Sequence, residues 1–396
     1  MAIRRMGRRR GEGLHEIAVD RLLATMACHG EAYQRLANER LAERLAARTP
    51  LMIFGAGQNG RLVQTLLRAA GLEPSAFIDD TPAKVGEVIE ATPIVGLDDA
   101  AVRPGAIAVC SIFSPGHEYL AVAARLRARG IETVSLFAFL AAFGAETLPF
   151  YFLDTPGCVL DARDELAWLA GRLADRASAD LLCAQVEFRL SLRHEALPPW
   201  TARREPPPAA WASFALIDAG AFDGDTLLPM MAGQGECISA ALALEPDPVT
   251  FAALERNITS AGPAVADRTV ALQAAADAVS GRRAFASVGN PGSGFSEAGE
   301  PVQTFAIDDL VEARLPGDER LYIKFDVEGA EADALRGAAR TIVARRPFLA
   351  VSAYHRPQDL WSLPRQISDL CDGYRYALRS HGADGADLML YGVPPS

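Results

Sequence analysis

The sequence predicts an α/β protein with two doubly wound, Rossmann-like domains, and three observations carry that prediction. Two short apolar runs lead into glycine-rich turns, at residues 55–60 and 220–224. About twenty residues beyond each turn, a second apolar run ends in an acid, Asp79 or Glu245. Later apolar runs alternate with helical patterns. A strand, a tight turn, a helix and an acid-ended strand follow one another in nucleotide-binding α/β units.

Composition limits the classes of partner. A chain of 396 residues is long enough for two domains. The net charge of −11 argues against a nucleic-acid backbone as the main partner. No apolar run approaches the roughly 20 residues that span a bilayer. The six cysteines show no C-x-x-C spacing and indicate free thiols in a reducing compartment. We therefore expect a soluble, cytoplasmic protein that binds no nucleic acid and spans no membrane.

Residues 1–48 predict a helical arm. Apolar residues, among them Leu22, Met26, Leu41 and Leu45, recur at steps of three and four. Such an arm either packs on the domain that follows or joins two copies into a homo-oligomer, and the sequence leaves both alternatives open.

Residues 49–142 predict the first Rossmann-like domain. The turn after its first strand has the spacing G-x-G-x-x-G, formed by Gly55, Gly57 and Gly60, and Asp79 ends the second strand. This pattern indicates a second nucleotide site. In the alternative interpretation, the glycines only allow the helix and the strand to pack tightly.

A helical and proline-rich linker is expected over residues 143–212, and a second α/β domain over 213–396. Its expected strands are 215–218, 240–245, 269–273, 321–326, 348–352, 374–380 and 388–393. The last two form an antiparallel pair. The glycine- and serine-rich segment 285–305 is expected to form an insert or flap.

The turn at 220–224 and the two acids beside it predict a cofactor pocket. Glycine lets the backbone approach a ligand closely. Glu245, at the end of the second strand, is placed to accept hydrogen bonds from ribose hydroxyls. Asp218, at the end of the first, is placed to meet a cationic amine. S-adenosylmethionine carries both groups.

Five segments, in order over the C-terminal half, carry a family likeness. They are IDAGAFDGDT (217–226), LEPDPVTFAALERN (244–257), VQTFAIDDL (302–310), YIKFDVEGAE (322–331) and YHRPQDLWSLP (354–364). This half resembles the FkbM-type methyltransferases, a branch of the class I S-adenosylmethionine-dependent enzymes. The resemblance implies a seven-stranded class I methyltransferase sheet and S-adenosylmethionine as the cofactor.

The resemblance also implies a set of cofactor-binding residues. They are Asp218, Gly220, Ala221, Phe222, Asp223, Gly224, Glu245, Pro246, Asp277 and Asp326. Many family members have Asn where this chain has Phe222, and we expect the turn not to need that side chain. Residues 51–140 look like a nucleotide- or CoA-binding-like module found ahead of some sugar-modifying enzymes, so a nucleotide or CoA-like ligand is the candidate for the N-terminal domain.

Two residues are the candidates for catalysis. Methyl transfer to a hydroxyl needs that proton removed, and His355, which titrates near neutral pH, is the expected base, with Glu328 beside it. No resident metal is expected, although a divalent cation held by Asp326, Glu328, Glu331 and His355 stays the alternative. Trp361 either stacks on a sugar ring or belongs to the core.

The function expected from these observations is an S-adenosylmethionine-dependent O-methyltransferase. Its acceptor, from the family likeness, is a sugar hydroxyl of a bacterial surface glycan or its precursor. Two alternatives use the turn at 55–60. One is an NAD-dependent oxidoreductase, and the other is a non-catalytic nucleotide-binding protein.

Overall fold

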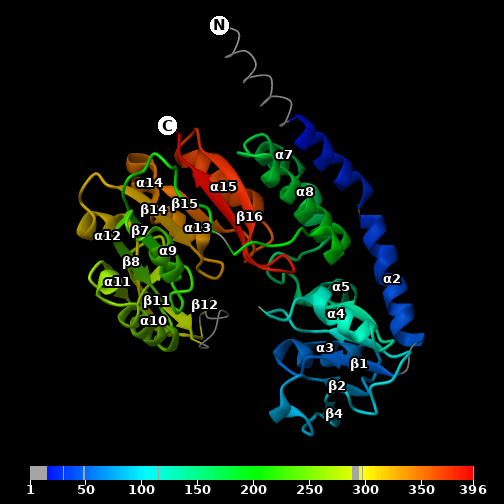
Figure 1. The fold of residues 1–396 in the computed structure, drawn as a ribbon. Helices are drawn as coiled ribbons and strands as arrows, with labels where there is room; N and C mark the ends of the chain where they lie inside the picture. The colour runs from blue at the N-terminus through cyan, green and yellow to red at the C-terminus, as the bar shows by residue number, and fades with distance from the viewer. Residues whose placement is uncertain are drawn as a thin grey trace.

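The computed structural model describes residues 16–29, 31–47, 50–114, 116–202, 204–287, 294–296 and 298–395. Two lobes lie side by side, each around its own sheet: an N-terminal lobe (residues 50–143) and a C-terminal lobe (residues 214–393) (Figure 1). Helices from the start of the chain and from between the lobes lie along one side of both (Figure 1). The predicted α/β class is confirmed.

The N-terminal lobe contains a six-stranded sheet in the order β3-β4-β2-β1-β5-β6. All neighbouring strands are parallel except β3 and β4. The central strands are short apolar runs buried along their whole length, because helices cover a parallel sheet on both faces. The elements are β1 (Leu51–Phe54), α3 (Gln58–Ala69), β2 (Ala76–Ile78), η1 (Pro82–Lys84), β3 (Val88–Ile89), β4 (Thr92–Val95), β5 (Ile107–Cys110), α4 (Tyr119–Arg127), β6 (Glu132–Ser135), α5 (Leu136–Phe143) and η2 (Ala145–Thr147).

The C-terminal lobe is built on a seven-stranded sheet in the order β16-β17-β15-β14-β7-β8-β9. The strands are β7 (Phe214–Ala219), β8 (Ile238–Leu244), β9 (Thr269–Leu272), β14 (Arg320–Phe325), β15 (Phe348–Ser352), β16 (Arg375–Ser380) and β17 (Leu388–Val393). The chain enters in the middle at β7, runs outward through β8 and β9, and returns to the other side of β7 at β14. The strand order therefore reverses between β7 and β14. In open α/β sheets, ligands bind outside the carboxyl ends of the strands at such a point.

Helices and a small second sheet surround this sheet. The helices are α9 (Leu227–Gln234), α10 (Pro248–Ser260), α11 (Pro263–Ala266), α12 (Ile307–Arg314), α13 (Glu331–Arg336), α14 (Ala339–Arg345) and α15 (Asp359–Leu370). The expected insert forms most of a four-stranded sheet made of β10 (Ala275–Ala276), β11 (Gly281–Ala286), β12 (Gly294–Phe295) and β13 (Glu300–Phe305). Residues 288–293 and 297 of that insert lie outside the described residues.

The helical segments before and between the lobes belong to their cores. They are a helix over residues 16–28, α2 (Glu31–Ala47), α6 (Pro156–Asp161), α7 (Arg163–Ala170), α8 (Arg176–Ser191) and η3 (His194–Ala196). Leu22 and Met26 pack with α8 into the core of the C-terminal lobe. Leu41 and Leu45 pack into the core of the N-terminal lobe. The apolar face expected for the arm is thus buried within this chain, and residues 1–15 of the arm lie outside the described part.

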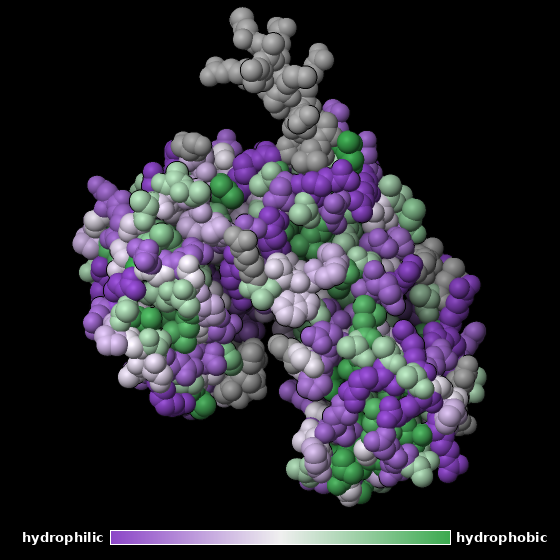
Figure 2. Space-filling view, in the orientation of Figure 1, coloured by the Kyte–Doolittle hydropathy of each residue, from purple (hydrophilic) through white to green (hydrophobic). Residues whose placement is uncertain are grey.

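The segment 143–212 differs from a plain linker, because its helices contribute residues to both cores. Leu182 and Val186 of α8 belong to the C-terminal core, and Phe188 of the same helix belongs to the N-terminal core. On the face shown in Figure 2, hydrophobic residues are scattered among polar ones, and the surface is indented between the lobes. No helix within the described ranges is long and apolar enough to cross a membrane. All six cysteines are free thiols.

Candidate active site

The glycine turn begins at the carboxyl end of β7. Gly220 and Ala221 donate backbone hydrogen bonds to the Leu244 carbonyl at the end of β8, at 3.0 and 2.9 Å. Gly220 has a φ of +80°, and a Cβ there would lie 1.8 Å from the Asp326 carbonyl oxygen. Only glycine therefore allows the turn to sit directly against the end of β14.

Phe222 has a φ of +49°, a left-handed conformation that non-glycine residues rarely adopt. Asn adopts this region several-fold more readily than most residues. The Asn of other family members thus fits the backbone here. Phe222 adopts the same conformation in this chain, and the expectation that the turn does not need the Asn side chain stays a prediction.

Glu245 follows β8 and is bound to the turn. Its Oε2 accepts a hydrogen bond from the Phe222 N–H at 2.9 Å, and its Oε1 accepts from the Asp247 N–H and the Thr250 hydroxyl, both at 2.9 Å. These hydrogen bonds lower the pKa of the Glu245 carboxyl, but burial outweighs them and raises it. Each carboxylate oxygen can accept two hydrogen bonds, so Oε2 keeps capacity for one more donor. Pro246, in this bend, is buried, and the following Asp247 caps α10.

Asp218 is placed differently from the sequence prediction. It is fully buried, and its Oδ1 accepts a hydrogen bond from the Lys324 ammonium at 3.0 Å. The same ammonium donates to the Gly220 carbonyl at 2.9 Å and lies 3.5 Å from Asp326 Oδ2. Burial alone would lower the pKa of Lys324, but the carboxylates of Asp218 and Asp326 outweigh it and raise that pKa. The cation that meets Asp218 is therefore a lysine of this chain.

Four polar side chains gather where β14 and β15 end. His355 Nδ1 lies 2.8 Å from Glu331 Oε1, and its Nε2 lies 3.4 Å from Glu328 Oε2 and 3.8 Å from Asp326 Oδ1. Asp326 Oδ1 also accepts a hydrogen bond from the Ser352 hydroxyl at 2.6 Å. The glycine turn and this cluster thus meet at the reversal point of the sheet.

The protonation states in this cluster differ from the sequence expectation. Burial would lower the pKa of His355, but Glu331, followed by Glu328 and Asp326, raises it to about 10. A histidine with this pKa is protonated at neutral pH, so it does not fit the role of a base that starts neutral. Burial raises the pKa of Glu328 to about 8. Burial acts in the same direction on Asp326, but Lys324 and His355 outweigh it and lower the pKa of that carboxyl to about 2.

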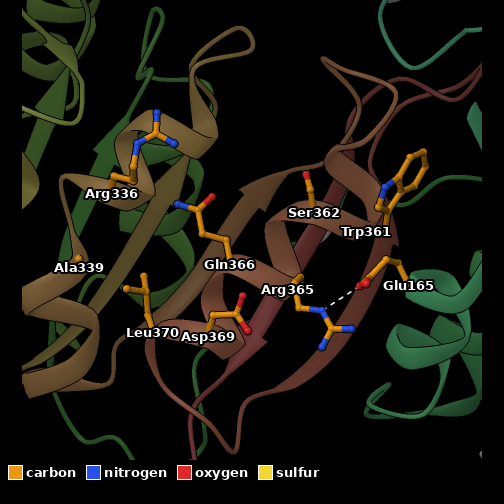
Figure 3. A pocket seen from close by; sticks show the side chains of 9 residues that line it. All are labelled: Glu165, Arg336, Ala339, Trp361, Ser362, Arg365, Gln366, Asp369 and Leu370. Atoms are coloured by element: carbon orange, nitrogen blue, oxygen red, sulfur yellow. Dashed lines mark hydrogen bonds and ion pairs between the residues drawn. The ribbon is translucent and has the colours of Figure 1, made fainter. Parts of the chain in front are cut away.

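Two predicted residues lie apart from this cluster. Asp277, at the end of β10, pairs with Arg283 at 3.2 Å, and Arg283 also contacts Asp333 of α13. Trp361 is 9% exposed and belongs to the core of the C-terminal lobe. It also borders a groove of about 730 Å³ among α7, α13, α14 and α15 (Figure 3). Arg336 lines that groove at the end of α13 opposite Glu331, so the groove is separate from the strand-end cluster.

The glycine turn at residues 55–60 is held by contacts within the N-terminal lobe. Asp79 Oδ2 accepts from the Ala56 N–H at 2.8 Å and from Lys84 at 3.2 Å. A Cβ on Gly60 would lie 2.0 Å from the Gly55 carbonyl oxygen, so tight packing alone accounts for that glycine. Gly57, in contrast, has open space around it.

Sequence reasoning missed four residues beside the site. Lys324 lies inside the apolar strand β14, and its sequence neighbours carry no sign of its partner Asp218. Tyr354 packs on His355, with ring centroids 4.1 Å apart. Tyr151, from the segment between the lobes, has its pKa raised by burial and then by the Glu328 carboxylate. The Thr226 hydroxyl after the turn is buried without a hydrogen-bond partner among the described residues.

The fold and the site first define a class of protein. In this α/β domain, a glycine turn and several acids meet where the strand order of the sheet reverses. Enzymes that bind nucleoside-containing cofactors have this arrangement. The family follows from residues 218–382, which match the family model described as the Methyltransferase FkbM domain. This part of the chain is therefore an FkbM-type methyltransferase domain, and the resemblance seen in the sequence is confirmed.

Among solved structures, the chain is similar to that of Methyltransferase FkbM from Methylobacillus flagellatus KT. The TM-score is 0.68 at 24% identity, and the match covers 96% of this chain and 99% of the other. This likeness shows a shared fold that extends over both lobes. No curated protein matches the chain.

Proposed function

We propose that the chain is an S-adenosylmethionine-dependent O-methyltransferase whose acceptor is a sugar hydroxyl of a bacterial surface glycan or its precursor. The observation that carries this proposal is the meeting of the glycine turn with Glu245, Asp326 and Glu328 at the reversal point of the sheet, inside the FkbM domain. Methyltransferases of this class use that edge for cofactor and acceptor together. The proposal includes the domain bounds expected from the sequence: a Rossmann-like domain over residues 49–142 and a methyltransferase domain over residues 213–396.

The turn and the residues after it suit S-adenosylmethionine. Gly220 to Gly224 form the turn, and the unpartnered Thr226 hydroxyl next to it offers a donor for the methionine carboxylate. Glu245 Oε2 has one free acceptor position for a ribose hydroxyl. When bound, the cofactor supplies an electrophilic methyl group. Asp218 acts through Lys324, which holds the Gly220 carbonyl and thereby the turn.

The acids at the end of β14 suit the acceptor. In the reaction, a lone pair of the acceptor oxygen forms the new bond to the methyl carbon. The bond from sulfur to that carbon breaks with its electron pair left on sulfur, and the hydroxyl proton leaves. We assign that proton to the deprotonated form of Glu328, because its pKa of about 8 lies below the value of about 10 for His355. Its side chain is also 26% exposed, whereas His355 is held by Glu331 at the back of the cluster.

Two aromatic side chains support a sugar as the acceptor. Tyr354 and Tyr151 are half-buried beside Glu328 and His355, and they come from different parts of the chain. Aromatic faces beside polar groups suit the apolar face of a sugar ring. They suit the sugar-stacking role that was one of the two alternatives for Trp361.

The test is calorimetric titration of the full chain with S-adenosylmethionine and its demethylated product. We expect binding by the wild type and about tenfold weaker binding or worse by Glu245→Ala, equivalent to roughly 1.4 kcal/mol. Glu255→Ala removes an exposed acid from α10 and serves as the matched control. Binding of NAD but not of S-adenosylmethionine would reject the proposal and favour the N-terminal turn.

A further inference from the structure

The cluster at the ends of β14 and β15 has the donor set of a metal site. Asp326, Glu331 and His355 each offer one atom able to ligate a metal, and these atoms lie within 4.8 Å of one another. We propose that these three residues bind one divalent transition-metal cation of the Mn²⁺ or Zn²⁺ type. The sequence analysis expected no resident metal and kept a cation at these residues as the alternative.

Two buried atoms point to a ligand there. Glu331 Oε2 and His355 Nε2 are buried and have no hydrogen-bond partner among the described residues. Their side chains are 1% and 2% exposed. A buried polar atom left without a partner is destabilising, and a bound ion often satisfies such an atom. A cation in the cluster accepts lone pairs from both residues.

The contact between Glu331 and His355 prepares the imidazole for a metal. Glu331 Oε1 accepts hydrogen bonds from the Val327 N–H at 2.9 Å and the Gly329 N–H at 3.4 Å, which fix the carboxylate. A carboxylate only accepts, so the ring nitrogen 2.8 Å away, Nδ1, carries the hydrogen. Nε2 then faces Asp326 and Glu328, and it releases its own proton when it ligates a cation. A histidine held by a carboxylate in this way is typical of metal ligands.

The charge and the accessibility of the cluster agree with a cation. The carboxylates of Asp326, Glu328 and Glu331 lie together, and the ammonium beside them is that of Lys324, 3.5 Å from Asp326. Asp326 is 19% exposed, whereas His355 and Glu331 lie behind it. The site thus has protein ligands on one side and an open position on the other, as catalytic metal sites have. One imidazole with two carboxylates suits Mn²⁺ or Zn²⁺ better than Ca²⁺, which takes oxygen ligands.

The role of the cation rests on the proposed function. At the open position it polarises the acceptor hydroxyl, while Glu328, 3.4 Å from His355, takes the proton. The existence of the site does not depend on that role, so binding can be measured without cofactor or acceptor.

The test is titration of the full, chelator-treated chain with Mn²⁺ alone. Binding is measured from the electron paramagnetic resonance signal of the free Mn²⁺ and, separately, by calorimetry. We expect about one Mn²⁺ per chain and at least tenfold weaker binding by Asp326→Asn and His355→Gln. His381→Gln removes another buried histidine of the same lobe and is expected to bind as the wild type does. Circular dichroism confirms that each variant is folded.

The outcomes separate this inference from the proposed function. A folded wild-type chain that binds S-adenosylmethionine but no Mn²⁺ overturns the metal site and leaves the methyltransferase proposal standing. A chain that binds Mn²⁺ but not S-adenosylmethionine supports the metal site and overturns the methyltransferase proposal. Equal Mn²⁺ binding by the wild type, Asp326→Asn and His355→Gln also overturns the site.

Discussion

At the scale of single residues, Glu328 combines a strained backbone with a place in the polar cluster at the ends of β14 and β15. Its φ is +51°, and Gly329 follows at +90°, so the chain turns sharply where β14 ends. A non-glycine residue in the left-handed region costs on the order of 1–3 kcal/mol, and such residues cluster at active sites. The turn directs the Glu328 carboxylate toward His355 and the open side of the cluster.

If Glu328 is the base, Glu328→Gln keeps the shape of the side chain but removes its ability to take a proton. We expect kcat to fall by about 10²–10⁴-fold and the Kd for S-adenosylmethionine to stay within about twofold. Glu312→Gln, on the exposed face of α12, is the control. Full turnover by the Glu328 variant in a labelled methyl-transfer assay would remove this residue as the base.

At the scale of elements, Lys324 joins the two strands at the sheet's reversal point. Lys324 of β14 lies opposite Asp218 of β7 in the strand register, and both are fully buried. The ammonium reaches past its partner to the Gly220 carbonyl. The cross-strand pair therefore fixes Gly220, the first residue of the glycine turn, relative to the acids after β14.

Lys324→Met should destabilise the chain strongly, because it leaves the Asp218 carboxylate buried without its partner. We expect a loss of about 3–5 kcal/mol in the free energy of unfolding, measured by urea denaturation. The double variant Asp218→Asn with Lys324→Met should recover part of the loss, because no charge is then buried alone. A single variant within about 0.5 kcal/mol of the wild type would show that the pair contributes little.

At the scale of the whole molecule, His194 lies where the lobes meet. Its ring packs on Phe137 of the N-terminal lobe and on Phe188 of α8, with ring centroids 5.8 and 4.9 Å apart. Its Nε2 lies 3.7 Å from Asp384, in the loop between β16 and β17, and Asp384 accepts from the Tyr119 N–H at 2.8 Å. Burial lowers the pKa of His194 to about 3 and raises that of Asp384 to about 6.

This junction predicts a loss of stability in acid. The unfolded chain takes up a proton at His194 below about pH 6.5, whereas the folded chain resists it down to about pH 3. Stability is thus full above pH 6.5 and falls by about 1.4 kcal/mol per pH unit below it. Between pH 7.5 and pH 5, the wild type should lose about 2 kcal/mol more than His194→Gln in urea denaturation.

The titration of Asp384 works in the opposite direction, since a raised pKa adds stability as pH falls below about 6. Asp384 is present in both proteins, so the difference between them reports His194 together with its 3.7 Å contact to Asp384. Equal pH dependence of the wild type and His194→Gln would contradict a buried, neutral histidine at the junction.

The α/β class, the positions of both glycine turns and the acids that end the strands could all be predicted from the sequence. These are local features: an apolar run, a turn that needs glycine and a polar residue at a strand end are written in neighbouring residues. It also carried the family likeness, because the five matching segments stand in order along the chain.

The contacts of these residues are set by the folded chain. Asp218 lies 106 positions from its partner Lys324, and no local pattern shows that pair. The sequence placed His355 and Glu331 at the same edge of the sheet, but their direct contact at 2.8 Å is visible only in the structure. The pKa of His355 depends on three carboxylates that the fold brings to one point. Pairing across strands and burial set the charge and the partner of a side chain, and both depend on contacts between residues far apart in the sequence.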